Sequence, residues 1–450
     1  MSTMDAQIRF QAMGLFDAKV PRYTSYPTAA HFKDAVGAGD HRTWVEAVPE
    51  GAEISLYLHI PFCRRLCWFC ACRTQGTQTL RPVEAYIQTL KNEISLLAQH
   101  LKPSVTLGRM HWGGGTPTLL SLELIEDLAS HIAAVLPLSD GAEFSVEIDP
   151  AEVDQPRIDA LAKAGMNRAS IGIQDFAPDI QVAIGRVQGF DITADAVEML
   201  RKAGVHSLNA DILFGLPDQT GRKITESVQK LLSLSPDRVA LYGYAHVPWM
   251  ARRQSMIPSD RLPTPQERLR LFETARRLFV WDGYREIGID HFATAHDGLA
   301  IAQETGALRR NFQGYTDDNT PWLIGLGASA ISRFPEGYTQ NISATSGYAT
   351  AIENGTFATA RGHNLTDEDR LRGRVIEKIM CDFDVVADDF GEDAARVRSL
   401  IGEARDAFGE TLGGMRGRLL IPTEARPLTR MVARHLDAYE ASPTGHSSAI

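Results

Sequence analysis

This sequence has little of what would place a protein outside the cell or in a membrane. Its 450 residues include only five cysteines, and four of these fall within ten positions. Cysteines so close together do not close the long loops of a disulfide framework. No apolar run reaches the roughly 18 residues of a membrane-spanning helix, and the N-terminus lacks the features of a secretory signal. We therefore expect a cytoplasmic protein with reduced thiols.

Positive charge is also scarce. The chain has 46 lysines and arginines against 56 aspartates and glutamates, for a formal net charge of -10. This balance provides no basic surface for nucleic acid or for an anionic membrane. If the substrate is acidic, arginines must reverse the charge locally.

Short β-rich apolar runs alternate with amphipathic helical patterns from about residue 53 onward. The expected strands are 54–60, 107–113, 143–149, 167–173, 207–215, 238–245 and 284–290. Such alternation is typical of a parallel sheet with right-handed crossovers. At least six units predict an α/β fold with a complete or partial barrel, whose chemistry lies at the C-terminal ends of the strands.

The pattern divides the chain into four parts. Residues 1–52 are expected to form a segment that covers the barrel, and residues 53–335 to form the barrel with an extension. Within the extension, residues 311–332 are Gly-rich and predicted to be loop. Helical patterns in 366–441 predict a small C-terminal helical domain, and 442–450 a disordered tail.

The clustered cysteines have the spacing of an iron–sulfur motif. Cys63, Cys67 and Cys70 read C-x3-C-x2-C, and Cys72 follows two positions later. Zinc modules usually combine C-x2-C with a distant second pair, which this chain does not offer. Ferredoxin-type runs bring four cysteines per cluster, whereas three are properly spaced here. Three thiolates would leave one iron of a [4Fe-4S] cluster open to chelate a small molecule.

This motif resembles that of the radical S-adenosylmethionine enzymes, and further stretches narrow the resemblance to the oxygen-independent coproporphyrinogen III oxidases. These stretches include PRYTSYPTAAHF (21–32), LYLHIPFC (56–63), CWFCAC (67–72), MHWGGGTPT (110–118), SVEIDP (145–150), IGIQDF (171–176), NADILFGLP (209–217), YAHVP (244–248) and NFQGYT (311–316). Ala71 departs from the expected glycine, and the C-terminal tail does not match.

The resemblance implies oxidative decarboxylation of two propionates of coproporphyrinogen III to vinyl groups, giving protoporphyrinogen IX in haem biosynthesis. The implied cofactors are a [4Fe-4S] cluster and two S-adenosylmethionine molecules. The implied partners are the porphyrinogen, a low-potential electron donor and an electron acceptor. Neither nucleic acid nor a membrane is expected, and we expect a monomer.

The resemblance also implies roles for individual residues. Cys63, Cys67 and Cys70 would bind the cluster, and Cys72 would be required without binding it. The first S-adenosylmethionine would contact Tyr57, Phe69, Gly114, Glu147 and Ile331, and the second Gly115, Thr116, Gln174, Arg186, Asp211 and Ala245. By residue type alone, Gln174 and Asp211 would be ordinary strand-end polar residues, and Arg186 a solvated surface charge.

Arg22 is our candidate for binding a substrate carboxylate. It lies in PRYTSYPT, which Pro21 and Pro27 stiffen, and arginine can bind a carboxylate through two hydrogen bonds. The alternative is that Arg22 packs on the barrel surface and contacts no ligand.

Two other functions remain open from the sequence. A haem-binding chaperone-like relative would share the barrel and cluster without the oxidase reaction. Such relatives generally lack the fourth cysteine and the PRYTSYPT segment, and this chain has both. A structural zinc protein would use its cysteines only to staple a loop, and iron and sulfide analysis would distinguish it.

Overall fold

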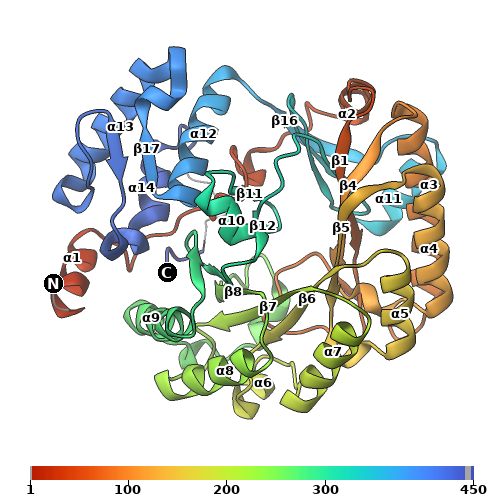
Figure 1. The fold of residues 1–450 in the computed structure, drawn as a ribbon, viewed down its shortest axis with the longest axis horizontal. Helices are drawn as coiled ribbons and strands as arrows, with labels where there is room; N and C mark the ends of the chain where they lie inside the picture. Colours follow the sequence, from red (N-terminus) through yellow and green to blue (C-terminus); the bar gives the residue numbers. More distant parts are fainter. Residues whose placement is uncertain (1–2, 441–446) are drawn as a thin grey trace.

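The fold is built on a twelve-stranded sheet with a parallel centre (Figure 1). The computed structural model describes residues 3–440 and 447–450. The strand order is β16-β15-β14-β13-β1-β4-β5-β6-β7-β8-β10-β9. The strands from β13 to β8 pair in parallel, and the outer strands pair antiparallel. Over the described residues the sheet has two edges, β16 and β9, and does not close on itself. The prediction of a complete or partial barrel is therefore confirmed in its partial form.

Six of the parallel strands lie where the sequence predicts them. They are β1 (Glu53–Ile60), β4 (Thr106–Gly114), β5 (Leu138–Ile148), β6 (Arg168–Gln174), β7 (Ser207–Phe214) and β8 (Arg238–Gly243). Their apolar side chains are mostly buried, as expected of parallel strands covered on both faces.

Helices in the connections between these strands cover the outer face of the sheet (Figure 1). They are α3 (Arg81–His100), α4 (Leu122–Val135), α5 (Gln155–Lys163), α6 (Pro178–Ala183), α7 (Phe190–Lys202), α8 (Gly221–Ser233) and α9 (Pro265–Trp281). Several begin at a side-chain cap, and α9 has a full capping box between Thr264 and Glu267. None of the described helices is both long enough and apolar enough to cross a membrane.

The last predicted strand differs from the parallel series. The stretch 284–290 forms β9 (Arg285–Ile287) at the edge of the sheet, and β10 (His291–Ala293) lies between it and β8. Only three residues connect β9 to β10. That length allows an antiparallel hairpin and no crossover helix.

The predicted loop 311–332 is wrong in part, because it contains strands. They are the end of β11 (Arg309–Asn311), β12 (Gly314–Thr316), β13 (Leu323–Leu326) and part of β14 (Ile331–Arg333). A Cβ atom on Gly325 would lie 2.4 Å from the Ile331 carbonyl oxygen. The glycine there therefore permits the chain to fold closely back on itself. Strands β15 (Gly337–Asn341) and β16 (Thr359–Asn364) complete this edge, with α10 (Gly298–Glu304) before it and α11 (Thr345–Glu353) packed on α3.

The C-terminal helices form a core of their own. Helices α12 (Asp367–Asp382), α13 (Ala394–Phe408) and α14 (Thr429–Leu436) pack with a two-stranded antiparallel sheet of β17 (Asp384–Val386) and β18 (Arg418–Leu420). Tyr23 and Tyr26 belong to this same core. The PRYTSYPT segment therefore packs against the C-terminal helices.

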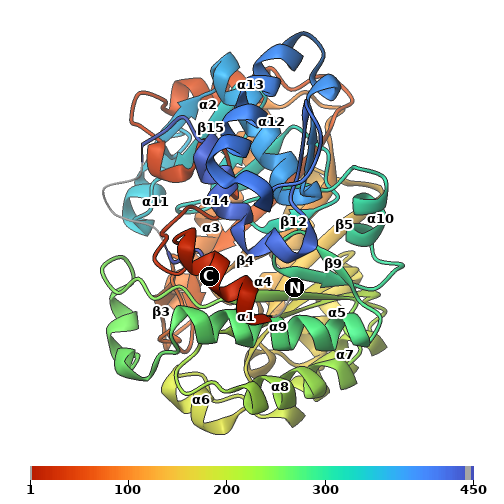
Figure 2. The ribbon, with the colours of Figure 1, turned by 90° about the vertical axis from the view of Figure 1, so that its left-hand side faces the viewer.

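The N-terminal segment contains two helices that contact different parts of the molecule. Helix α1 (Thr3–Ala12) lies on α9 (Figure 2), where the Gln266 amide donates to Gln11. Helix α2 (Ala38–Glu46) packs against α3 and β16.

The end of the chain differs from the predicted tail. Residues 442–446 lie outside the described residues. In contrast, Ser448 pairs with Lys19, and the Ala449 N–H donates to the Ala18 carbonyl (2.8 Å). Ala449 and Ile450 also pack in an apolar cluster with the N-terminal segment, so residues 447–450 are ordered by burial and backbone hydrogen bonds.

Candidate active site

The cysteine loop lies at the C-terminal ends of the parallel strands, as the sequence predicts. It follows β1 and is held at both ends by pairing of β2 (Phe62–Cys63) with β3 (Gln75–Gly76). In its middle, the Trp68 N–H donates to the Ile184 carbonyl (3.0 Å). Cys67 is buried, Cys63 and Cys70 are half-buried, and Cys72 is exposed.

The motif thiols are close enough to affect one another's ionisation. Burial raises the pKa of Cys63 to about 11, and the charges of Cys70 and Cys67 contribute to the rise. A hydrogen bond from Cys72 is the main reason that the pKa of Cys70 falls to about 6, and that bond raises the pKa of Cys72 well above its usual range. Cys70 is therefore more ready to ionise than Cys63 or Cys72.

The donor set fits a [4Fe-4S] cluster bound by three thiolates. Three thiols share one short loop, and Nη1 of Arg186 lies 3.6 Å from the Cys67 sulfur, where it would offset negative charge. In the part of the chain that is described, no three His, Cys, Asp or Glu side chains converge on a site for a single ion. A four-iron cluster is larger and is held by thiolates spread around it.

Glu147 joins the end of β5 to the glycine turn after β4. Its carboxylate accepts from the Gly114 N–H (3.0 Å) and lies 3.5 Å from Nε2 of His111. Burial alone would raise the pKa of Glu147, but these two donors and the charge of His111 lower it below its usual value. The carboxylate is thus ionised, and it has further acceptor capacity for ribose hydroxyls.

Tyr57 lies near Glu147, and Ile331 lies on the other side of Tyr57. The Tyr57 ring stacks on His111 at 5.6 Å between ring centroids, and Tyr57 pairs in register with Gly325 of β13. Since Gly325 lies directly against Ile331, β14 brings Ile331 to the same place. The structure therefore groups three residues that the resemblance assigns to the first S-adenosylmethionine.

Gly115 and Thr116 bond the glycine turn to the start of the cysteine loop. The Gly115 N–H donates to the Ile60 carbonyl (2.9 Å), and the Thr116 N–H donates to the Phe62 carbonyl (2.8 Å). A Cβ atom on Gly115 would lie 2.5 Å from that same Phe62 oxygen. Only glycine fits this close approach.

Gln174 and Arg186 lie together over Gly172, next to the cysteine loop. Gln174 ends β6 in the left-handed region (φ 71°), which a non-glycine residue adopts at some energetic cost. Arg186 donates to the Gly172 carbonyl (2.9 Å) and pairs with Asp149 (3.4 Å). It is only 9% exposed, so the interpretation of Arg186 as a solvated surface charge is wrong.

Asp211 lies on the neighbouring strand, in register with Gly172. Its carboxylate accepts from the Asn209 amide (2.9 Å) and from the Ser170 hydroxyl (3.4 Å). Burial raises the pKa of Asp211 to about 6, and the charge of Glu147 adds to the rise. The charge of Glu147 in β5 therefore reaches Asp211 in β7.

Known proteins share this arrangement. A model of the radical SAM superfamily matches residues 57–231. The oxygen-independent coproporphyrinogen III oxidase of Paracoccus denitrificans is 58% identical over 451 residues, covering 99% of this chain and 100% of that protein. The one of Cereibacter sphaeroides (ATCC 17023) is 55% identical over 443 residues, with 98% of each covered. The present chain belongs to the oxygen-independent coproporphyrinogen III oxidase family.

A solved member of this family has the same fold. The structure of coproporphyrinogen III oxidase from Escherichia coli, described as a radical SAM enzyme, superposes with a TM-score of 0.88 at 32% identity. The superposition covers 94% of this chain and 100% of that one. The resemblance found in the sequence is thereby confirmed for both family and fold.

The sequence analysis did not identify Gln254, although its side chain contacts two residues that are predicted to bind the cofactors. It lies fully buried in the 3-10 helix Arg252–Met256. Its amide donates to the carbonyls of Phe69 (2.8 Å) and Ala245 (3.0 Å), and so ties the cysteine loop to the end of β8. Phe69 and Ala245 are both predicted cofactor contacts, but no local sequence signal marks the glutamine that positions them.

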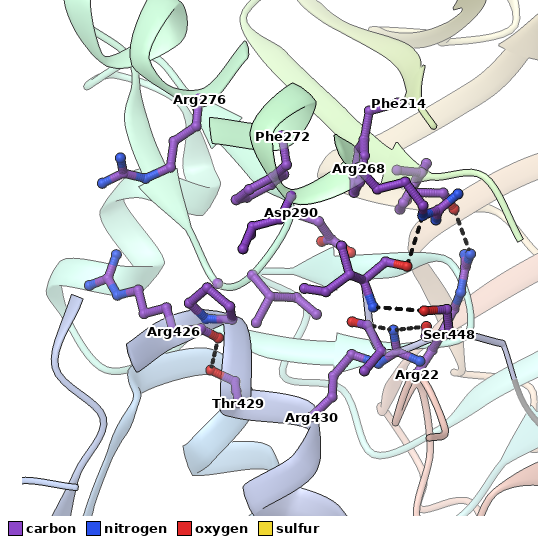
Figure 3. A pocket seen from close by; sticks show the side chains of 18 of the residues that line it. Arg22, Phe214, Arg268, Phe272, Arg276, Asp290, Arg426, Thr429, Arg430 and Ser448 are labelled. Atoms are coloured by element: carbon purple, nitrogen blue, oxygen red, sulfur yellow. Dashed lines mark hydrogen bonds between the residues drawn. The ribbon is translucent and has the colours of Figure 1, made fainter. Parts of the chain in front are cut away.

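A pocket with about 960 Å³ of unfilled space opens beside β8 (Figure 3). We call it the arginine pocket, because its walls include six arginines against three acidic side chains; the arginines are Arg22, Arg268, Arg276, Arg310, Arg426 and Arg430. Ala245 also lines it, so it reaches the predicted second cofactor site. Arg22 donates to the Gly243 carbonyl (2.9 Å), which places this candidate on the pocket wall.

Proposed function

We propose that this chain converts coproporphyrinogen III to protoporphyrinogen IX without oxygen. The observation that carries the proposal is the 58% identity to the Paracoccus denitrificans oxidase over 99% of this chain. The site supports it, because thiols for a cluster, a carboxylate for a nucleoside and a cationic pocket for an acidic substrate lie along one edge of the sheet.

Cys63, Cys67 and Cys70 would hold the cluster, whose electron cleaves S-adenosylmethionine to methionine and a 5'-deoxyadenosyl radical. Beside them, Glu147 would accept hydrogen bonds from the ribose, and Tyr57 with Ile331 would form the walls around it. Cys72 is exposed and next to Cys70, where it could act on the substrate side of the loop without binding iron.

A second S-adenosylmethionine would lie farther along the sheet. Gln174 ends β6 and Asp211 lies in β7, while Ala245 follows β8. These three residues come from neighbouring strands. Arg186 would contribute its guanidinium, and Gly115 and Thr116 their backbone, between the two cofactors. Two S-adenosylmethionine molecules agree with two propionates that react.

The reaction at each propionate requires one electron acceptor. A hydrogen atom leaves the β-carbon, the bond between the α-carbon and the carboxylate breaks, and CO2 and one electron depart as the vinyl group forms. The chain's task is to hold the propionate against the radical and to exclude water. Arg22 would position the carboxylate. We infer a cytoplasmic monomer that needs a low-potential electron donor and a separate electron acceptor.

An anaerobic assay tests the proposal. Reduced, iron-loaded protein with S-adenosylmethionine and coproporphyrinogen III should release 5'-deoxyadenosine and protoporphyrinogen IX, separated by chromatography. Replacing Cys63, Cys67 or Cys70 by Ala should abolish cluster absorbance, whereas Cys72→Ala should keep the absorbance and lose turnover. Arg22→Lys should mainly raise the substrate concentration that is needed. Full cofactor cleavage by the unmodified protein without any vinyl product would contradict the proposed function.

A further inference from the structure

Arg310 is a buried cation whose hydrogen-bonding capacity is not used. It lies in β11 and is only 7% exposed. Its Nε and Nη1 are buried, and neither has a hydrogen-bond partner among the described residues. Its ion-pair distance to Asp290, 3.9 Å between Nη1 and Oδ1, is too long for a hydrogen bond. Buried donors in native proteins are almost always paired, so these unpaired groups need an explanation.

The described residues around Arg310 hold its guanidinium in place but accept no hydrogen bond from its Nε or Nη1. The group lies over the Tyr315 ring, 4.3 Å from its centroid, in a cation–π contact. The Tyr315 hydroxyl is itself anchored, because it donates to the Met380 carbonyl (2.7 Å). The backbone N–H of Arg310 donates to Glu377. Arg310 is therefore held in one orientation, and its N–H groups are left for another partner.

Asp290 does not serve as that partner. Its Oδ1, the oxygen 3.9 Å from Nη1 of Arg310, lies 2.7 Å from Nδ1 of His291. That oxygen is therefore already in a hydrogen bond. Burial alone would raise the pKa of Asp290, but Arg310 and His291 lower it to about 2. The aspartate thus remains ionised and keeps Arg310 charged without forming a hydrogen bond to it.

Four other arginines of the arginine pocket have ion-pair or hydrogen-bond partners, and Figure 3 draws the bond of Arg268. Arg276 and Arg426 both pair with Glu286 at 2.8 Å. Arg430 donates to backbone carbonyls of the N-terminal segment and of the chain end, and Arg268 donates to the Ile450 carbonyl (3.0 Å). Arg426 keeps one buried nitrogen, Nε, without a partner in the described part of the chain, whereas Arg310 has two and no carboxylate hydrogen-bonded to its guanidinium.

The pocket also has the shape and chemistry of a porphyrinogen site. Phe214, Phe272 and Tyr242 give it an aromatic wall, which suits a large apolar ring. Arg310 also borders a second cavity, which Arg333 lines as well. Arg310 therefore borders two cavities, and both are lined by further arginines. A substrate ring with carboxylates around its rim requires cations at more than one place.

We propose that Arg310 binds a propionate carboxylate of the substrate through its unpaired N–H groups and thereby determines specificity for the carboxylated porphyrinogen. This inference rests on the proposed function. An acidic side chain of the substrate would satisfy the buried donors, whereas an analogue without the carboxylate would leave them unpaired, which is strongly disfavoured.

The test compares Arg310→Gln and Arg310→Lys with Arg276→Gln. Arg276 is the matched control, because it lines the same pocket but is already paired with Glu286. The probe is coproporphyrin III, the stable oxidised tetracarboxylate, titrated into iron-loaded protein and followed by its absorption. Arg310→Gln should weaken binding on the order of 10- to 100-fold, the range for a hydrogen bond to a charged group. Arg310→Lys should recover part of this loss, and Arg276→Gln should change binding by less than about threefold.

A second measurement separates binding from structure. Arg310→Gln leaves the buried, ionised Asp290 without its cation and should lower the thermal midpoint, whereas Arg310→Lys keeps the charge and should stay close to the unmodified protein in both midpoint and iron content. The tetramethyl ester of coproporphyrin III should bind the unmodified protein weakly and should not distinguish it from Arg310→Gln.

Three outcomes would overturn the inference. These are unchanged coproporphyrin III binding by Arg310→Gln, equal losses in Arg310→Gln and Arg276→Gln, or a loss in Arg310→Gln that is equally large for the tetramethyl ester. Failure of the proposed function would look different, since the unmodified protein would then bind coproporphyrin III and cleave S-adenosylmethionine without forming vinyl groups.

Discussion

Glu93 should make the stability of this protein depend on pH in a way that one substitution removes. The side chain is 1% exposed on the inner face of α3. It accepts hydrogen bonds from the Gly327 N–H (2.7 Å), the Tyr348 hydroxyl (2.7 Å) and the Asn341 amide (2.8 Å). These donors favour the charged form, but burial outweighs them and raises the pKa of Glu93 to about 7.

The sign of the effect follows from the raised pKa. Between pH 4.5 and about 7 the folded protein keeps a proton that the unfolded chain releases. The stabilising contribution is therefore complete below pH 4.5 and is lost as the pH rises to about 7. At 1.36 kcal/mol per pKa unit, a rise from 4.5 to about 7 corresponds to about 3 kcal/mol.

Glu93→Gln places an uncharged group of the same shape in this position. At pH 5 the variant should be about 1–3 kcal/mol less stable than the unmodified protein, because the Gln NH2 faces groups that all donate. Between pH 5 and pH 8 the variant should gain about 2–3 kcal/mol relative to the unmodified protein. Gly327 and Asn341 flank the turn that carries Ile331, so the same bonds support the predicted cofactor site.

Urea unfolding of both proteins at pH 5, 6, 7 and 8, with equal iron content, measures this difference. Effects of every other titrating group cancel in the comparison. Glu84→Gln is the matched control, since Glu84 lies on the same helix and is exposed, and its difference from the unmodified protein should not vary with pH. The reasoning would be refuted if the difference in free energy of unfolding between Glu93→Gln and the unmodified protein stayed constant across this range. It would also be refuted if the variant lost stability relative to the unmodified protein as the pH rises.

Three further predictions concern the site. Gly115→Ala should lower the iron content, because its Cβ would lie 2.5 Å from the Phe62 carbonyl oxygen at the start of the cysteine loop; full iron loading would contradict this. Gln254→Ala should weaken retention of S-adenosylmethionine by about 1–3 kcal/mol, because the Phe69 carbonyl loses a buried donor; isothermal titration measures it. Asp211→Asn should reduce bound S-adenosylmethionine from two molecules to one while cleavage of the first continues, and a count of two in the variant would be inconsistent with the assigned role.

The sequence predicts the parallel strands because each is a short apolar, β-rich run between helical patterns. Strand β1 is an example, in which Ile54, Leu56, Leu58 and Ile60 alternate with Ser55, Tyr57 and His59. Strand β13 could not be found in this way, because it has four residues and contains Gly325. Its partner β1 lies in a distant part of the chain, and no local pattern encodes that pairing.

The same distinction holds for the site. The spacing of Cys63, Cys67 and Cys70 is a local signal, and it places the cysteine loop correctly. Arg186, in contrast, follows a helix and looks like a surface residue until Asp149 and the Cys67 sulfur are brought beside it. Residues whose role depends on contacts between distant segments, as for Gln254 and Arg310, have no signature in a single sequence.

Charge placement explains how an acidic chain can bind an acidic substrate. Burial and the nearby charge of Arg22 lower the pKa of Arg430 to about 9 and that of Arg268 to about 10. These depressed values mean that the cations of the arginine pocket repel one another and are poorly solvated before a ligand arrives. A carboxylate that enters the pocket relieves both effects, so the unfavourable arrangement in the free protein becomes favourable in the complex. The net charge of -10 does not oppose this, because exposed charges more than about 10 Å away are largely screened by salt. On this proposal a few buried arginines govern binding, and among them Arg310 has the most buried nitrogens without a partner among the described residues.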